Sequence, residues 1–419
     1  MSKRTANGST THLQNGATAT KRKLTLLTKG GDSKEKHEGF LTIAASFVVA
    51  HQIDRNIFFA SIAEGIAESR VHPALWRFDI ILQHTSTGHL WLPVTFISLI
   101  SVLHVLQVPI ARKFLYLSYE TLPGSGQYDV GRDDIYFVAF WVLAFTAIRD
   151  AIMWYFLRPF ARWNGVRTEK KLVRFAEQGW SFLYYMVFWT LGMYIMYHSP
   201  HWFNTAYYWI DYPHKPIGQL AKWYYLVQFG FWVQQVFVLN IEERRKDYPA
   251  MLTHHIITCI LISSSYFTNF TRIGNAVLCT MDFSDIVLSL AKLLNYLDMR
   301  TICDIMFGVF LLSWLVTRHI FFGIIIWATY AEPELYLDMK WEPEHGKYFT
   351  PFTKSVYLSL FITLQIVIIF WFFMILRVAL KVIRGSGAED TRSDSEEEES
   401  VESVQSAIYT NGINGIKHE

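Results

Sequence analysis

Long apolar runs alternate with polar segments along most of this chain. Between residues 90 and 380, several windows reach the roughly 20 apolar residues that a helix needs to cross a bilayer. Residues 1–39 and 385–419 are polar instead, the second with a dense acidic run, and neither contains enough apolar residues to bury a core. The pattern predicts an all-α, polytopic membrane protein with a disordered tail at each end.

The apolar windows predict about eight transmembrane helices. They lie at roughly residues 90–110, 135–157, 181–197, 223–239, 253–270, 273–294, 304–328 and 355–380. The run 40–50 is too short to span and is followed by His51, Asp54 and Arg55, which indicates an interfacial or buried segment.

The distribution of basic residues predicts the orientation. An even number of spans places both termini on one side of the membrane. Lys and Arg are denser in loops 158–180, 240–254 and 295–303 than in the opposite loops, so both termini are predicted to be cytosolic. The opposite loops 198–216 and 330–349 are rich in Trp and Tyr, which is typical of chain lying at headgroup level.

Composition narrows the class of protein further. The chain has 419 residues, of which 18% are charged, against about a quarter in an ordinary soluble protein. Its 38 basic and 36 acidic residues nearly cancel, which argues against a nucleic-acid binder. The three cysteines, Cys259, Cys279 and Cys303, lack the paired spacing of zinc or disulfide frameworks and are interpreted as packing residues.

Charged and polar residues inside the predicted spans are costly and need burial in protein or water. They are His104, Arg149, Asp150, Lys292, Arg318 and His319. Hydrogen bonding between helices and snorkelling would explain them, as would a polar cavity inside the bundle. On the second interpretation, Arg149 and Arg318 are candidates for contact with a substrate.

The densest polar constellation joins the fifth and sixth predicted spans. His254 and His255 open the fifth span, and Asp282 and Asp285 share one face of the sixth. Because the two spans are antiparallel, all four side chains should lie in the cytosolic half of the membrane. An imidazole oriented by a carboxylate can act as base, acid or nucleophile. A buried ion-pair cluster and a zinc or iron site remain alternatives.

These residues resemble a known family. The stretch 242–300, with YPAMLTHH at 248–255 and CTMDFSDIV at 279–287, is similar to the Lag motif of ceramide synthases within a TLC domain. The resemblance extends through RPF (158–160), HSPHWFNT (198–205), YWIDYP (208–213) and WLVTRH (314–319), and so covers about residues 150–380. Met281 stands where many animal and plant members have His, as in the fungal version.

The resemblance implies an activity and an architecture. It implies an endoplasmic-reticulum acyltransferase that joins a long or very-long-chain acyl-CoA to a sphingoid base, with His254, His255, Asp282 and Asp285 as the catalytic set. No metal or cofactor is implied, since acyl-CoA is a co-substrate. Six or seven helices would form a bundle around a lipid tunnel within a catalytic domain at 135–384. Residues 40–134 would hold the interfacial segment, the first transmembrane helix and a lumenal loop.

Further residues are candidates for binding and regulation. Arg244, Arg245 and Lys246 could bind the coenzyme A phosphates, or could simply set the topology. Trp202, Asn204 and Tyr212 are substrate-contact candidates, with packing and interfacial anchoring as the alternative. Ser393 and Ser395 precede acidic residues by three positions, as acidophilic kinases favour. The resemblance also implies a small single-span accessory subunit, and homo- or hetero-dimerisation with a paralogue is a further expectation.

Two other classes of function remain to be distinguished. A di-iron membrane hydroxylase would need more histidines in spaced boxes than the chain has. A noncatalytic TLC protein that binds, senses or transports lipid is the second alternative, although all four polar residues are intact. The residues leave open which histidine contacts the acyl group, the choice of sphingoid base and acyl length, and whether the chain serves bulk synthesis or toxin resistance.

Overall fold

The computed structural model describes residues 88–241 and 246–383. The described chain is almost entirely helical, as the apolar windows predict. The segments expected at 1–39, 40–87 and 385–419, together with Arg244, Arg245, Ser393 and Ser395, lie outside the described residues.

The first half of the described chain contains α4 (Gly88–Val105), α5 (Pro109–Leu115), β1 (Gln127–Tyr128), α6 (Asp134–Ile152), the π-helix η2 (Met153–Leu157), α7 (Arg158–Trp163), α8 (Glu169–Tyr197), the 3-10 helix η3 (Thr205–Tyr208), β2 (Ile217–Gly218) and α9 (Gln219–Ile241). The second half contains α10 (Tyr248–Phe267), α11 (Thr271–Tyr296), α12 (Arg300–Trp314), the π-helix η4 (Leu315–Phe321), α13 (Phe322–Ala331), α14 (Pro333–Tyr336), the 3-10 helix η5 (Pro343–His345) and α15 (Pro351–Ile383). The two short strands pair antiparallel.

A helix lies at each of the eight predicted span positions. Four stretches are long and apolar enough to cross a membrane, namely 134–163, 248–267, 300–331 and 351–382. The first predicted span is shorter than expected, because α4 ends at Val105 and Pro109 begins a separate helix. The chain is therefore a polytopic, mostly helical membrane protein.

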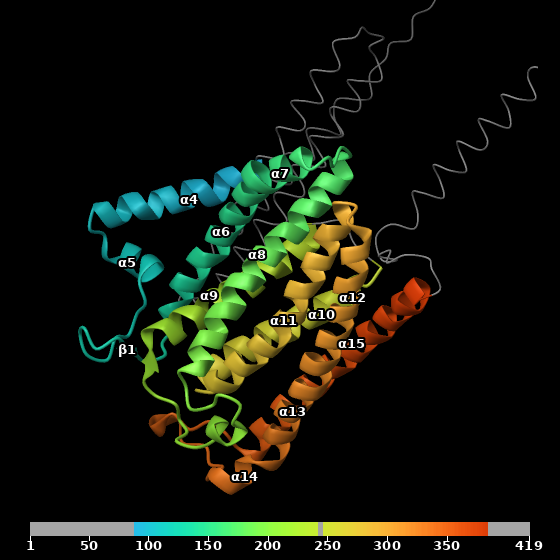
Figure 1. Cartoon of the computed structure of the whole chain (residues 1–419). Coiled ribbons are helices and arrows are strands. Elements are labelled where there is room, and N and C mark those ends of the chain that lie inside the picture. The colour runs from blue at the N-terminus through green and yellow to red at the C-terminus, as the bar shows by residue number, and fades with distance from the viewer. Residues whose placement is uncertain (1–87, 242–245, 384–419) are drawn as a thin grey trace, which may run out of the picture. The chain divides into compact units, whose positions relative to one another are not determined.

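Helix α11 lies at the centre of the bundle. It packs along α8 on one side and α12 on another, while α9 packs against α6 and α10, and α15 packs against α10 and α13 (Figure 1). Buried residues occur on most faces of α11, from Ile273 to Ala291. We call the end of the bundle with residues 158–169 and 296–300 the α7 end, and the end with residues 116–133, 198–218 and 332–350 the β1 end.

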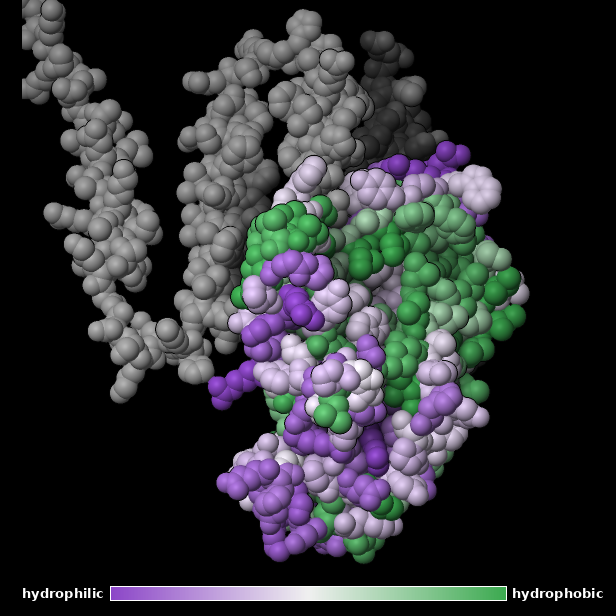
Figure 2. All heavy atoms as spheres, turned by 90° about the vertical axis from the view of Figure 1, so that its left-hand side faces the viewer, coloured by the Kyte–Doolittle hydropathy of each residue, from purple (hydrophilic) through white to green (hydrophobic). Residues whose placement is uncertain are grey.

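Apolar side chains cover the outside of the bundle. Trp91, Trp327, Phe352 and Phe373 are each more than 60% exposed, which suits contact with lipid and not with water. Figure 2 shows hydrophobic residues gathered over the upper part of one face and hydrophilic residues below them. The exposed apolar surface therefore agrees with a membrane-embedded bundle.

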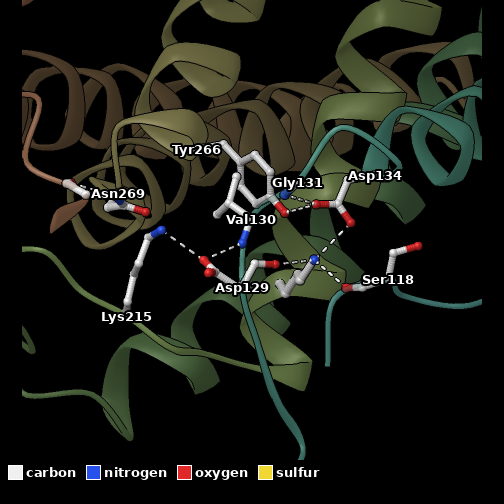
Figure 3. Close-up of polar contacts among 10 residues, drawn as sticks. Ser118, Asp129, Val130, Gly131, Asp134, Lys215, Tyr266 and Asn269 are labelled. Atoms are coloured by element: carbon white, nitrogen blue, oxygen red, sulfur yellow. Dashed lines mark hydrogen bonds and ion pairs between the residues drawn. The ribbon is translucent and has the colours of Figure 1, made fainter. Parts of the chain in front are cut away.

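A buried lysine fixes the β1 end. Lys222, at the start of α9, is fully buried and forms an ion pair with Asp134 of α6 at 2.9 Å. Figure 3 labels its partners Asp134, Ser118 and Asp129. Its ammonium also donates to the carbonyl oxygens of Ser118 (2.8 Å) and Asp129 (2.7 Å), and Tyr266 of α10 donates to Asp134 at 2.7 Å. These bonds hold α6, α9, α10 and the loop 116–133 in one register.

Candidate active site

A polar cavity of about 210 Å³ opens among the helices toward the α7 end. Residues from α6, α8, α9, α10, α11, α12, η4 and α15 line it. Among them are five of the residues singled out from the sequence: Arg149, His254, His255, Asp285 and Arg318. The structure therefore brings together side chains that are up to 169 positions apart in the chain. Lys292, a sixth residue singled out from the sequence, lines the cavity as well.

Aromatic rings hold both imidazoles. Pro249 stands in the first turn of α10, where the missing N–H costs nothing, and the two histidines follow within two turns. The Trp232 ring from α9 lies 5.6 Å from the His254 ring and 5.4 Å from the His255 ring. Trp371 from α15 lies 5.4 Å from the His254 ring. Packing by these large rings restricts how the imidazoles can rotate.

The two histidines differ in their hydrogen bonding. Nδ1 of His255 lies 2.7 Å from the carbonyl oxygen of Met251. A carbonyl oxygen only accepts, so Nδ1 carries the proton, and in the neutral ring Nε2 presents a lone pair. Nδ1 of His254 is buried and has no hydrogen-bond partner among the described residues. His254 is therefore the one of the two histidines with a buried ring nitrogen that no described residue binds.

Each carboxylate is bound by a residue other than histidine. Asp285 forms an ion pair with Arg318 of η4 at 2.7 Å, and Arg318 also donates to the carbonyl oxygen of Met281 at 3.0 Å. Asp282 is 1% exposed and accepts a hydrogen bond from Gln228 of α9 at 3.3 Å. Gln228 in turn accepts a hydrogen bond from Tyr184 of α8.

The imidazole–carboxylate contact expected from the sequence is not observed. Among the described residues, no hydrogen bond or ion pair joins His254 or His255 to Asp282 or Asp285. The physical reason is that Gln228, Trp232 and Arg318 occupy the positions beside these groups. Within residues 88–241 and 246–383, no three His, Cys, Asp or Glu side chains converge as a metal ligand set.

An apolar pocket, which we call the inner pocket, adjoins the cavity. Its volume is about 50 Å³, and His254 and Trp232 line both spaces. It extends to Trp209, Phe270 and Phe349, all nearly completely buried toward the β1 end. Gly274 is required in its wall, since a Cβ there would lie 1.7 Å from the Tyr225 hydroxyl. His254 thus stands where a polar space meets an apolar one.

The aromatic loop lies away from the cavity. Asn204 accepts a hydrogen bond from the backbone N–H of Ala206, and Trp202 packs against the rings of Tyr197 and Phe203. Tyr212 donates to the carbonyl oxygen of Thr268 at 2.9 Å. The structure does not bring these candidates to the histidines, and their contacts agree with packing. Lys246 is exposed and does not line the cavity.

Three contributors to the site were missed by the sequence reasoning. Gln228, Trp232 and Trp371 stand in apolar stretches that give no sign of a polar neighbour. The available signal was the polar amide of Gln228, which stands with Gln234 and Gln235 inside a predicted span. A buried amide in a span is costly for the same reason as a charge there.

The sequence of the chain also matches a known domain family. Residues 174–377 match the TLC domain family. The chain is therefore a TLC-domain polytopic membrane protein.

The particular family follows from relatives that match about 70% of the chain. The chain is 44% identical over 292 residues to sphingosine N-acyltransferase lag1 of Schizosaccharomyces pombe, covering 70% of this chain and 74% of that protein. It is 39% identical over 318 residues to ceramide synthase FUM18 of Gibberella moniliformis (70% and 74%) and 36% identical over 305 residues to ceramide synthase LAG1 of Saccharomyces cerevisiae (70% and 72%). The chain belongs to the ceramide synthase (sphingosine N-acyltransferase) family, and the resemblance drawn from its motifs is confirmed.

Proposed function

We propose that this chain is a ceramide synthase that transfers the acyl group of a long or very-long-chain acyl-CoA to the amine of a sphingoid base. Family membership supports the reaction. The observation that carries the site is that His254 borders both the polar cavity and the inner pocket. A thioester with an apolar chain on one side and a large polar group on the other fits such a junction.

The reaction has a simple balance. The ammonium of the base loses one proton, and its nitrogen attacks the thioester carbonyl carbon. The C–N bond forms, the C–S bond breaks, and the amine gives up a second proton, which coenzyme A takes as it leaves as a thiol. The site must therefore accept protons and stabilise a developing oxyanion.

The side chains suit separate roles in this scheme. His255 can accept the amine proton at Nε2, because Met251 fixes its tautomer. His254 faces the acyl carbon from the mouth of the inner pocket. Arg318 supplies positive charge for the oxyanion, and Asp285 holds its guanidinium in place. Asp282, fixed by Gln228, completes the polar set.

The coenzyme A phosphates would bind at the cavity mouth. Arg149 and Lys292 line the cavity, and both carry positive charge toward an anionic ligand. Lys246, with Arg244 and Arg245 beside it in sequence, would extend this basic region.

The arrangement of the chain in the cell completes the proposal. In this proposal the chain crosses the membrane of the endoplasmic reticulum eight times, with both termini in the cytosol. The catalytic domain covers residues 135–384, and the C-terminal tail is phosphorylated at Ser393 and Ser395. An accessory single-span subunit and dimerisation with a paralogue belong to the same proposal.

The test is an assay of purified chain in vesicles with palmitoyl-CoA or a very-long-chain acyl-CoA and sphinganine. Mass spectrometry should detect the N-acyl product from the wild type and almost none from the variant with His254, His255, Asp282 and Asp285 all changed to Ala. Product at the wild-type rate from a folded quadruple variant would overturn the site. Binding of both substrates without product would favour the noncatalytic alternative.

A single-substrate incubation separates nucleophile from base. If His254 forms an acyl-imidazole, wild-type protein given acyl-CoA alone should release about one equivalent of coenzyme A and gain one acyl mass on the α10 peptide. A general-base enzyme should show neither change.

A further inference from the structure

A second apolar space lies on the other side of α11 from the inner pocket. We call it the lateral groove; its volume is about 520 Å³. It is lined by Trp189, Met193, Met196, His201, Phe203, Thr205, Tyr208, Ala276, Cys279, Thr280, Phe283, Val309, Leu312, Ser313, Val316, Thr317, Phe321, Ile324 and Ile325. Not one of these lining residues is acidic or a Lys or Arg.

The same helix separates the two apolar spaces. On α11, Gly274, Val277, Leu278 and Met281 line the inner pocket, whereas Ala276, Cys279, Thr280 and Phe283 line the lateral groove. Met281 of the first set and Phe283 of the second set are the two neighbours of Asp282 in sequence. The other residues of both sets precede Asp282 and lie closer to the first residue of α11, at the β1 end. Two apolar spaces therefore extend from the level of the catalytic carboxylates, on different faces of one helix.

The π-helix η4 and the residue pair before it form the wall between the groove and the polar cavity. Trp314 and Arg318 line the cavity, while Ser313 and Thr317, next to them in sequence, line the groove. Thr317 is hydrogen-bonded to Ser284 of α11 at 2.7 Å, and Ser284 directly precedes Asp285. π-Helical turns are frequently found at functional sites. The two residues of this hydroxyl pair, Ser284 and Thr317, are thus next in sequence to the two residues of the ion pair, Asp285 and Arg318.

The groove also reaches the membrane-facing surface and stays neutral along its length. Val309, Leu312 and Ile324 are 43%, 62% and 49% exposed. At the β1 end, burial lowers the pKa of His201 to about 4, so that imidazole is uncharged at neutral pH. A hydrocarbon chain dissolved in the bilayer can enter such a groove without desolvating a charge.

We propose that the lateral groove binds the hydrocarbon chain of the sphingoid base, with the ammonium group directed past Ser284 and Thr317 toward Asp285. This inference rests on the proposed function. The product has two hydrocarbon chains joined at the amide, so a site for the reaction needs two apolar spaces that converge on one reacting centre. Because His254 begins the inner pocket and basic residues line the adjoining cavity, acyl-CoA takes that pair of spaces.

Charge complementarity assigns the groove to the base. Asp285 is the carboxylate of the cavity nearest in sequence to the groove wall, and its side chain is 24% exposed. An ammonium arriving from the groove can share this carboxylate with Arg318. An anionic coenzyme A arriving by the same route would be repelled by it.

Two matched substitutions on α11 provide the test. Thr280→Phe adds bulk to the wall of the groove, and Val277→Phe, three residues earlier on α11, adds bulk to the wall of the inner pocket. Steady-state kinetics in vesicles should show that Thr280→Phe raises the KM for sphinganine at least about fivefold and changes the KM for acyl-CoA less than about twofold. Val277→Phe should do the reverse.

Additional variants guard against misfolding. Val316→Trp fills the groove from the η4 side and should repeat the effect of Thr280→Phe, while Ile320→Trp on the same segment, outside the groove and 50% exposed, should leave both KM values unchanged. A base with a short alkyl chain should be less affected by Thr280→Phe than sphinganine is.

The outcomes separate this inference from the proposed function. If wild-type protein makes ceramide and both groove variants keep the sphinganine KM within twofold, the inference is overturned and the proposed function stands. If Thr280→Phe raises the KM for acyl-CoA instead, the two chains are assigned to the wrong spaces. If the wild type makes no ceramide under any substrate pair, both proposals fail.

Discussion

At the residue scale, Gln228 links polar groups of α8, α9 and α11. It is fully buried, accepts from the Tyr184 hydroxyl, and donates to Asp282 at 3.3 Å and to Tyr224 at 3.2 Å. A buried amide in such a network is costly to remove, because its partners lose their hydrogen bonds without regaining water. Its position suggests that it acts on the reaction through Asp282.

Gln228→Leu should therefore lower kcat more than it changes either KM. Loss of one buried hydrogen-bonding partner costs about 1–3 kcal/mol, which corresponds to a decrease in kcat of about 5- to 160-fold if it is expressed in the transition state. Gln219→Leu, at the exposed start of the same helix, is the control and should leave kcat unchanged. If Gln228→Leu lowers the amount of folded protein but leaves kcat per folded molecule unchanged, Gln228 has a structural role only.

The histidine and carboxylate positions can be tested for mutual dependence. If His255 and Asp285 act on one transition state, the double variant His255→Ala, Asp285→Ala should be scarcely slower than either single variant. Independent substrate-binding roles would instead multiply the losses. The measurement is kcat/KM for the wild type, the two single variants and the double variant, at matched amounts in the membrane. The Asp285→Asn variant checks separately what the ion pair with Arg318 contributes.

At the element scale, the ion pair of Lys222 and Asp134 fixes how α9 stands against α6. Gln228 and Trp232 lie on α9 about 9 and 15 Å along the axis from Lys222, at 1.5 Å per residue. Any axial shift of α9 would displace Trp232 from both imidazoles and Gln228 from Asp282. The anchor at the β1 end thus positions groups near the other end.

Lys222→Met should strongly destabilise the protein. It leaves the Asp134 carboxylate buried without its cation, and breaking a buried pair in this way costs about 3–5 kcal/mol. Thermal unfolding in detergent should show a large fall in the midpoint. Lys222→Met combined with Asp134→Asn should recover part of it.

A surface ion pair supplies the comparison. Lys113 and Asp133 lie 2.9 Å apart with side chains 43% and 32% exposed, and Lys113→Met should change the midpoint little. Equal effects of Lys113→Met and Lys222→Met would contradict the anchoring role.

The sequence predicted the helices better than their contacts. Mean hydropathy located eight helices, because burial in lipid acts on whole windows of about 20 residues. The spacing of His254, His255, Asp282 and Asp285 indicated a common site. The contact partners of these four side chains depend on how each helix is rotated about its axis relative to its neighbours. The presence of Trp232 or Gln228 in the sequence does not reveal that rotation. The π-helical turns of η2 and η4 and the break after Val105 were also not predicted, since each involves only a few residues.

At the scale of the whole molecule, the proposed orientation with cytosolic termini would place the β1 end in the lumen. The sequon at Asn269 (N-F-T) would then face the glycosylation machinery. Its side chain is fully buried, however, and its amide nitrogen donates to the carbonyl oxygen of Gly346 at 2.9 Å. The acceptor nitrogen is thus inaccessible in the folded protein.

We expect Asn269 to remain unmodified while a new sequon nearby is glycosylated. The double substitution Asp338→Asn, Lys340→Thr creates N-M-T where the two native side chains are 66% and 61% exposed. Treatment of microsomes with an endoglycosidase should shift the mobility of this variant and not that of the wild type. No shift in either protein, together with protection of both terminal tags from protease, would reverse the orientation.

The buried far end of the inner pocket has a kinetic consequence. Trp209, Phe270 and Phe349 are each at most 2% exposed, so an acyl chain bound against them, as proposed above, would withdraw past His254 before the product diffuses away. A long acyl chain would have to widen the inner pocket, whose volume is about 50 Å³. Each methylene that it then buries adds about 0.8 kcal/mol to be overcome on leaving. Turnover of longer acyl groups would then be limited by product release, with an initial burst followed by a slower steady rate, while shorter ones would be limited by bond formation.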